Sequence, residues 1–211
     1  EKTVLYAGAG ALLSSVAAFA MKRSLADMAF ASGIPGSVGG ALVMNAGAYD
    51  GEISDVCAGT LVFEPDRDRF YFYDREAQRF GYRQSLYQST NCIAVGAWFA
   101  LMPGNPEEIR RKTADFTERR RTKQPIELPS AGSTFKRPAG AYAAQLIDTC
   151  GLRGYRVGGA GVSEKHCGFV VNYGGASCSD VLAVMRHVRD VVARETGFVL
   201  EPEVRIVGET L

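Results

Sequence analysis

The chain carries the segment Ser32-Gly33-Ile34-Pro35-Gly36-Ser37-Val38-Gly39-Gly40, followed closely by Asn45-Ala46-Gly47-Ala48-Tyr49. Glycines and a proline at this density are incompatible with the interior of a helix or strand. We therefore expect a loop lined by main chain, with little side-chain bulk in front of its N–H groups. Such groups suit a phosphate or the edge of a flavin, although a tight turn before a strand would give the same pattern.

Composition excludes several classes of protein. The 211 residues suffice for one large or two small domains, and 46% hydrophobic with 22% charged residues is ordinary for a globular chain. A net charge of +1 argues against a protein that coats nucleic acid or membrane. Five cysteines without Cys-x-x-Cys spacing, and two histidines, argue against a disulfide framework and a metal site. We expect a cytoplasmic protein without metal.

The uncharged stretch from Thr3 to Met21 raises the question of a membrane span or signal peptide. Glycines and serines interrupt it, so we expect a strand over 3–7, a turn, and a helix over 11–22. The sequence Gly8-Ala9-Gly10 lacks the third glycine of the dinucleotide fingerprint, and no Gly-Lys-Ser/Thr follows Gly40 as in a P-loop. A nucleotide cofactor would therefore be bound by another architecture.

The remaining pattern predicts two blocks, residues 1–122 and 123–199, and a closing segment 200–211. Apolar periodicity and turn signals predict a hairpin over 61–73, strands over 93–101, 168–172 and 199–207, and helices over 106–121, 142–150 and 179–196. The 106–121 helix leads into a basic run, which we interpret mainly as a solvated face.

Three further motifs carry polar side chains in distinctive contexts. They are Ser130-Ala131-Gly132-Ser133-Thr134-Phe135, Phe80-Gly81-Tyr82-Arg83-Gln84-Ser85 and Pro202-Glu203-Val204-Arg205. Each has an ordinary explanation when taken alone, as a turn serine, a surface arginine and an edge-strand ion pair. Along the chain, the glycine-rich segment comes first, followed by the Arg83 motif, the Ser133 motif and the Glu203 motif.

In that order the motifs resemble the UDP-N-acetylenolpyruvoylglucosamine reductase (MurB) family, of its shorter type II branch. The resemblance implies an α+β fold: an FAD-binding domain similar to the vanillyl-alcohol-oxidase/PCMH type over 1–122, an α+β substrate domain over 123–199, and a C-terminal strand that returns to the flavin side. It also implies that Ser133 is the general acid and that Arg83 and Glu203 stabilise an enolate. NADPH would reduce FAD, and the enolpyruvyl group of UDP-N-acetylglucosamine enolpyruvate would be reduced to UDP-N-acetylmuramate.

The same resemblance assigns binding residues. Those expected to hold FAD are Gly36, Ser37, Gly39, Gly40, Asn45, Gly47, Ala48 and Tyr49. Those expected to bind the UDP-linked substrate are Tyr82, Arg119, Lys123, Arg137, Arg153 and His166. A satisfied polar residue at a strand entrance is the alternative for His166. We expect a monomer that binds neither nucleic acid nor membrane.

Two departures from the family pattern matter. Relative to the full-length pattern, we expect the chain to lack roughly the first eighty residues, including a glycine-rich strand-loop around the flavin pyrophosphate. Ala29 stands where an acidic residue is expected. Two alternatives therefore stay open: a non-catalytic UDP-sugar-binding fragment that cannot hold FAD, and another FAD oxidoreductase of the same fold.

Overall fold

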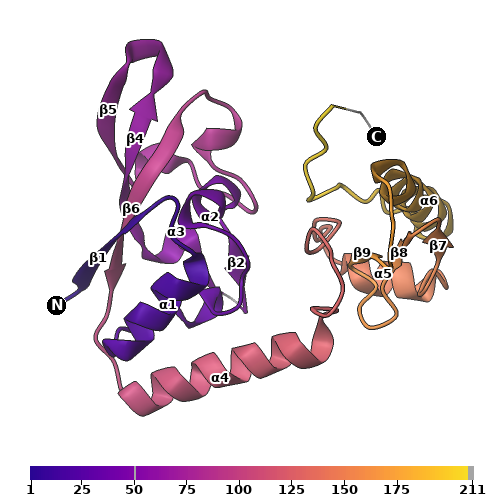
Figure 1. Ribbon diagram of the computed structural model, residues 1–211, viewed down its shortest axis with the longest axis horizontal. Coiled ribbons are helices and arrows are strands. Elements are labelled where there is room, and N and C mark those ends of the chain that lie inside the picture. The colour runs from indigo at the N-terminus through magenta and orange to yellow at the C-terminus, as the bar shows by residue number, and fades with distance from the viewer. Residues whose placement is uncertain (50, 209–211) are drawn as a thin grey trace. The chain divides into compact units, whose positions relative to one another are not determined.

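The computed structural model describes residues 1–49 and 51–208, and the chain folds as two compact units, Glu1–Arg119 and Arg120–Leu211 (Figure 1). The closing segment expected over 200–211 thus extends outside the described residues at its last three positions. Within the described ranges, no helix is both long enough and apolar enough to cross a membrane.

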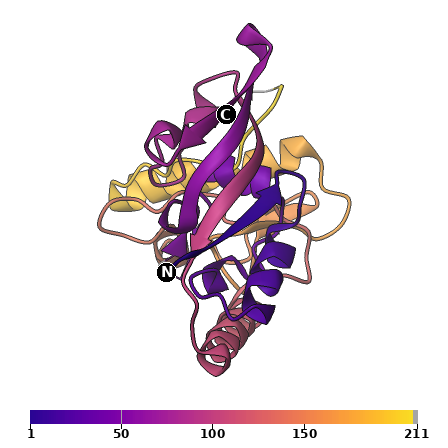
Figure 2. The same cartoon turned by 90° about the vertical axis from the view of Figure 1, so that its left-hand side faces the viewer.

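The first unit is built on one antiparallel sheet with strand order β1-β6-β4-β5. Its elements are β1 Thr3–Gly8, α1 Leu13–Lys22, α2 Val38–Met44, β2 Gly47–Ala48, β3 Gly51–Glu52, α3 Ile53–Val56, β4 Cys57–Glu64, β5 Arg69–Asp74, β6 Ile93–Leu101 and most of α4 Pro106–Lys123. Figure 2 shows β1, β4 and β6 side by side, and Figure 1 shows α1, α2 and α3 on one side of the sheet.

Alternation along the strands separates the two faces of this sheet. Ala7 and Phe99 point into a core that also contains the buried stripe of α1, whose members are Leu13, Val16, Ala17 and Ala20. On the opposite face Tyr6, Trp98 and Phe72 form an aromatic cluster, with Tyr6 and Trp98 as cross-strand partners. The predicted strands 3–7 and 93–101, the hairpin 61–73 and the first helix are confirmed.

Helix α2 corrects one expectation, because Gly39 and Gly40 lie inside a helix and not in a loop. Ser37 caps this helix, its Oγ accepting a hydrogen bond from the Gly40 N–H at 3.2 Å. A side chain at residue 39 would lie 3.2 Å from the Cβ of Ala9 and 3.3 Å from its carbonyl oxygen. Close packing therefore selects glycine here at the expense of helix propensity.

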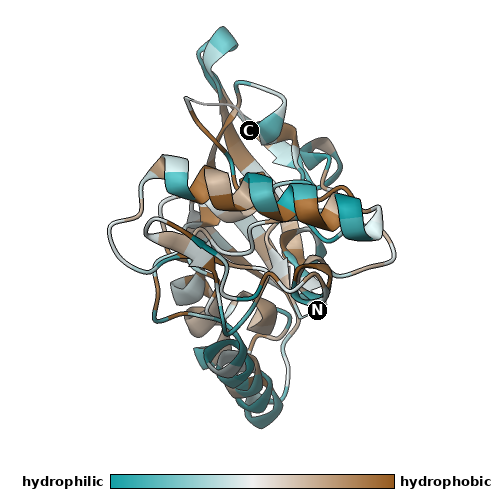
Figure 3. Cartoon of the chain, turned by 90° about the vertical axis from the view of Figure 1, so that its right-hand side faces the viewer, coloured by the Kyte–Doolittle hydropathy of each residue, from teal (hydrophilic) through white to brown (hydrophobic). Residues whose placement is uncertain are grey.

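The second unit pairs a small antiparallel sheet with two helices. Its elements are the end of α4, then α5 Ala143–Thr149, β7 Arg156–Val157, β8 Ala160–Val162, β9 Val170–Asn172 and α6 Cys178–Thr196. The strands follow one another in the order β7-β8-β9. Helix α6 buries Leu182, Met185, Val188 and Val192 and shows both brown and teal bands, whereas α4 is mostly teal (Figure 3).

The strand expected over 199–207 is wrong. The segment makes only an isolated bridge, between Pro202 and Phe135, with flanking bonds from the Lys136 N–H to the Glu201 carbonyl and from the Glu203 N–H to the Thr134 carbonyl. Phe135 and Pro202 form a pair whose N positions point away from each other, and the neighbouring Thr134 N–H donates to the Gly168 carbonyl at 2.8 Å and not back to Glu203, so the ladder does not continue. Although no strand forms, Val204 and Ile206 are partly buried and pack against the core of the second unit.

Candidate active site

The glycine-rich segment is fastened to the β1–α1 connection. The Val38 and Gly39 N–H groups donate to the carbonyls of Ala11 and Ala9, at 2.9 and 2.8 Å. Gly36 has a φ of 111°, in a region that side chains rarely adopt. The fastened segments expose bare main chain, because no atom of the described residues, apart from each glycine and its two chain neighbours, lies within 4 Å of the Cβ position at Gly8, Gly10 or Gly36.

Asn45 is buried inside this region, with an exposed fraction of 0% and a left-handed φ of 42°. Its Oδ1 accepts from the Ser54 N–H at 2.9 Å, and its Nδ2 donates to Glu52 Oε1 at 2.8 Å and to the Gly81 carbonyl at 3.0 Å. Both Oδ1 and Nδ2 of the Asn45 side chain are therefore hydrogen-bonded to other groups of the protein. Asn45, expected to bind the cofactor, thus joins the glycine-rich segment to the turn that carries Arg83.

The residues after Asn45 form the β2–β3 hairpin. Gly47 is required there by space, because a Cβ would lie 2.7 Å from the Gly51 carbonyl oxygen. Tyr49 has a φ of 52°, and its ring stacks on Phe116 of α4 with centroids 4.4 Å apart. Ala48 is half-buried in β2. This part of the motif therefore has a structural explanation as a tight hairpin.

Arg83 occupies the tip of a two-residue turn closed by reciprocal hydrogen bonds between Gly81 and Gln84, at 3.0 and 3.1 Å. Its φ of 54° is left-handed, a conformation that costs a residue with a side chain about 1 kcal/mol or more. Its guanidinium donates to the Gly47 carbonyl at 3.0 Å and lies 5.2 Å from the ring centroid of Tyr82. The turn thus directs a permanent cation toward the hairpin.

Ser133 and Glu203 lie in the second unit on paired segments. The Glu203 N–H donates to the Thr134 carbonyl at 2.9 Å, and the Thr134 N–H donates to the Gly168 carbonyl at 2.8 Å. Thr134 is buried, whereas the neighbouring Ser133 is exposed after Gly132, whose φ is 85°. The structure therefore anchors Thr134, the residue after Ser133, through both its N–H and its carbonyl, and leaves Ser133 itself exposed.

Arg153 and His166 meet around one loop of the second unit. The Arg153 guanidinium binds Asp148 through two bonds, of 2.9 and 2.7 Å, and also donates to the Glu164 carbonyl. His166 Nδ1 accepts from the Gly168 N–H at 3.1 Å, which leaves Nε2 to carry the proton of the neutral ring. Burial, with a smaller contribution from the Arg153 charge, holds the pKa of His166 below its ordinary value.

The other residues expected to bind substrate lie in polar settings. Arg119 forms an ion pair with Asp115 at 2.8 Å, and Lys123 follows one helical turn later, exposed at the end of α4. The Arg137 guanidinium lies over the ring of Tyr142, 4.0 Å from its centroid. Basic side chains on both units thus remain at the surface.

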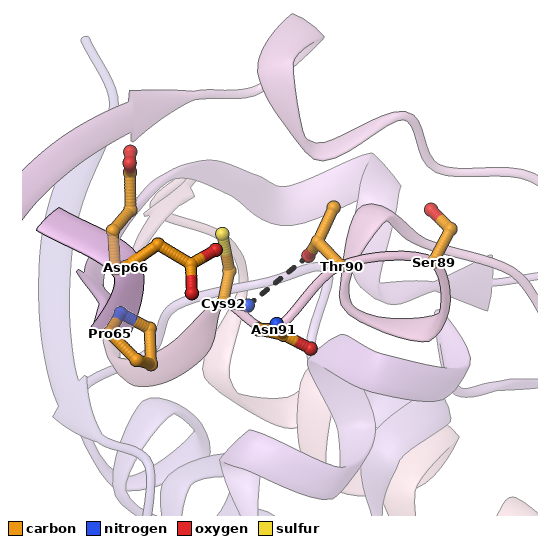
Figure 4. A pocket seen from close by; sticks show the side chains of 7 residues that line it. Pro65, Asp66, Ser89, Thr90, Asn91 and Cys92 are labelled. Atoms are coloured by element: carbon orange, nitrogen blue, oxygen red, sulfur yellow. Dashed lines mark hydrogen bonds between the residues drawn. The ribbon is translucent and has the colours of Figure 1, made fainter.

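Two hollows in the first unit lie apart from the predicted site residues. One, of about 390 Å³, is lined by Glu64, Pro65, Asp66, Ser89, Thr90, Asn91 and Cys92 (Figure 4). The other, of about 380 Å³, is mostly apolar and includes Gly8 and Phe19. The sequence analysis considered Gly8 and Gly10 only as part of an incomplete dinucleotide fingerprint and did not predict them as site residues. No sequence signal marked Gln88, which contacts the backbone of Arg83.

Comparison with known proteins defines the class. Residues 1–67 match the model of an FAD binding domain, and residues 124–207 match the model of the C-terminal domain of UDP-N-acetylenolpyruvoylglucosamine reductase. Mixed α+β units with these two matches define the chain as a flavin-dependent oxidoreductase.

The chain belongs to the UDP-N-acetylenolpyruvoylglucosamine reductase family. It is 47% identical over 209 residues to the reductase of Caldanaerobacter subterraneus, covering 99% of this chain and 69% of that protein. Identity to the Agathobacter rectalis reductase is 50%, covering 98% of this chain and 65% of that protein. The crystal structure of the Thermus caldophilus reductase superposes with a TM-score of 0.84 at 36% identity, covering 95% of this chain and 71% of that one. The chain thus spans about two thirds of the length of its relatives.

Proposed function

We propose that the chain reduces the enolpyruvyl group of UDP-N-acetylglucosamine enolpyruvate to give UDP-N-acetylmuramate, with NADPH as the electron donor. The observation that carries this proposal is the 47% identity to a named reductase along 99% of the chain. Reduction of an enol ether conjugated to a carboxylate requires a hydride at one carbon, a proton at the next, and stabilisation of the enolate between the two transfers.

The residues present fit FAD, because a wide ligand can approach main chain that carries no side chain. Gly8, Gly10 and Gly36 leave their Cβ positions open, Ser37 caps the short helix α2, and Gly39 and Gly40 lie in its first turn. Gly47, Ala48 and Tyr49 would complete the holding surface, with Asn45 fixing their backbone from below. When bound, FAD supplies two-electron chemistry that accepts a hydride from NADPH and passes it on.

Arg83 would stabilise the negative charge that develops on the substrate carboxylate. A guanidinium is always charged and presents N–H donors in a fixed plane that matches two carboxylate oxygens. The turn holds this group before substrate arrives, so little reorganisation is needed when charge develops.

Ser133 would donate the proton that completes reduction, and Glu203 would act with Arg83 on the enolate. A serine hydroxyl is a weak acid, so it can protonate only a strongly basic carbanion-like centre. The exposed position of Ser133 beside the anchored Thr134 suits this task. Tyr82, Arg119, Lys123, Arg137, Arg153 and His166 would bind the nucleotide-sugar portion, the cations pairing with its diphosphate.

We also propose that the protein works as a monomer in the cytoplasm. All five of its cysteines are free thiols, as is usual in a reducing compartment.

The test is to load the purified chain with FAD, remove free flavin, and follow NADPH oxidation with and without the enolpyruvyl substrate. We expect a retained flavin absorbance and oxidation that depends on substrate. If UDP-sugar binds by calorimetry but no flavin is retained, the chain is a binding fragment. Substrate-independent NADPH oxidation would instead indicate an oxidoreductase with another substrate.

A further inference from the structure

The turn that carries Arg83 is held by side chains from distant parts of the first unit. Asn45 Nδ2 fixes its start through the Gly81 carbonyl, 3.0 Å away. Ser85 Oγ fixes its end by donating to the Val43 carbonyl at 2.8 Å. Neither bond is made to the main chain of Arg83, the residue with the left-handed φ, and a third side-chain contact reaches it there.

Gln88 supplies that contact. Its Nε2 donates to the Arg83 carbonyl at 3.0 Å and to the Val43 carbonyl at 2.8 Å. Val43 lies in the last turn of α2, where helix carbonyls lack intrahelical partners. One amide group therefore ties the left-handed backbone of Arg83 to the end of the helix that begins at the glycine-rich segment.

The geometry explains why this tie is useful. Arg83 has a backbone conformation that side chains disfavour, so without tethers the turn would relax to a more common one. Relaxation would swing the guanidinium away from the Gly47 carbonyl, which it now meets at 3.0 Å. A displacement of this kind removes a pre-organised cation while leaving its charge and identity unchanged.

We propose that Gln88 is a positioning residue for Arg83, holding its main chain so that the guanidinium is directed before substrate binds. The proposal rests on the role of Arg83 given above. It adds a residue that acts through the backbone of Arg83, to whose carbonyl its Nε2 donates.

The test uses the full chain with Gln88→Met, which keeps the length of the side chain but removes the donor. Tyr87→Phe is the matched control: its neighbouring hydroxyl bonds Thr60 and Gln78 at 2.9 Å, so its loss also costs a buried hydrogen bond but leaves Arg83 untouched. Gln88→Lys restores an N–H donor on a flexible chain and serves as the rescue variant.

The first readout needs no cofactor. Trypsin cleavage after Arg83, followed by mass spectrometry, reports how often the turn opens, and cleavage after the exposed Arg67 is the internal reference. We expect Gln88→Met to accelerate cleavage at Arg83 about tenfold relative to Arg67. Tyr87→Phe should leave the ratio near that of the unaltered chain, and Gln88→Lys is used only in the second readout, because trypsin also cleaves after lysine.

The second readout is the pair of half-reactions of the FAD-loaded chain. Gln88→Met should slow reoxidation by the enolpyruvyl substrate about tenfold or more, with reduction by NADPH unchanged, and Gln88→Lys should recover much of the rate. Unchanged cleavage and unchanged reoxidation in Gln88→Met would overturn the proposal.

Arg83→Lys separates this proposal from the proposed function. If Arg83→Lys slows reoxidation but Gln88→Met does not, the positioning role of Gln88 is overturned. If Gln88→Met opens the turn while neither variant alters reoxidation, the tether stands and the catalytic role of Arg83 fails.

Discussion

The hydroxyl of Ser133 is the group whose proposed role is most sharply separable from the rest of the reaction. In Ser133→Ala, reduction of bound flavin by NADPH should proceed at the normal rate, because that half-reaction needs no acid. Reoxidation by the enolpyruvyl substrate should fall by about 10²–10⁴-fold, the usual contribution of a positioned general acid. Stopped-flow absorbance measures the two steps in one sample.

Thr134→Val provides the control for that substitution. Thr134 Oγ1 accepts the Val170 N–H at 2.8 Å, so this change disturbs the same segment without removing the hydroxyl of Ser133. Normal reoxidation in Ser133→Ala would eliminate Ser133 as the proton donor. Equal losses in both variants would show that segment geometry, and not the acid, limits the rate.

At the residue scale, the sequence indicated which residues are candidates for the site better than it indicated which residues contact them. Arg83 was visible through its motif, but its left-handed backbone was not, since glycine or asparagine is usual at that turn position. Asn45 and Gln88 meet the Arg83 turn from 36 and 5 residues away in sequence. Such contacts follow from tertiary packing, which local pattern does not encode.

At the element scale, helix α2 shows two neighbouring glycines with opposite demands. At Gly39 a Cβ would press on Ala9, whose N–H and carbonyl are both fixed in hydrogen bonds of 2.8 Å. At Gly40 a Cβ would meet only Ser37 Oγ, at an ordinary 3.7 Å. The two positions therefore form a pair of neighbouring helical glycines that differ in the space available to a Cβ.

Gly40→Ala should raise the free energy of unfolding by about 0.5 kcal/mol, because alanine favours the helix over glycine. Gly39→Ala should lower it, because the same gain is outweighed by crowding against a backbone that cannot shift. Urea unfolding followed by the fluorescence of Trp98, the only tryptophan, measures both in the first unit. A stabilised Gly39→Ala would mean that Ala9 yields more readily than its hydrogen bonds suggest.

Elements with strong periodicity were predictable, and elements that depend on pairing were not. Helix α6 has a capping box at Ser177 and Asp180 and a glycine in the left-handed conformation at its end, all local signals. The segment 199–207 alternates like a strand, yet whether it joins a ladder depends on its partner, where the Thr134 N–H donates to the Gly168 carbonyl and not back to Glu203. The loop predicted at Gly39 and Gly40 was wrong because glycine has a low helix propensity, and propensity does not include the close packing of α2 against Ala9.

At the scale of the whole molecule, the two units differ in how acid acts on them. Both histidines, His166 and His187, belong to the second unit, and the first unit has none. The pKa of His166 is lowered on folding, chiefly by burial, so the unfolded chain binds a proton there more readily than the folded one. Stability of the second unit must therefore fall as pH drops below about 6.5, until the folded pKa is reached.

A second loss follows at lower pH, because the hydrogen bond from Arg153 holds the pKa of Asp148 below its ordinary value. Stability from this carboxylate is complete above its unfolded pKa and is lost as pH falls through the folded one. Between pH 7 and 5, however, His166 is the group that requires a change among the described residues of the second unit, because its pKa is lowered from an ordinary value of 6.5. Its slope is at most about 1.4 kcal/mol per pH unit, and less here because the ring is partly exposed.

The expected result is thus a pH response confined to one unit. Hydrogen exchange of α6 peptides should show weaker protection at pH 5 than at pH 7 after correction for intrinsic rates, while Trp98 fluorescence should give the same unfolding midpoint at both. His166→Gln should remove the change in α6, and His187→Gln, which alters a ring stacked on Tyr155, should keep it. If His187→Gln removes the change and His166→Gln does not, the burial of His166 is not its cause.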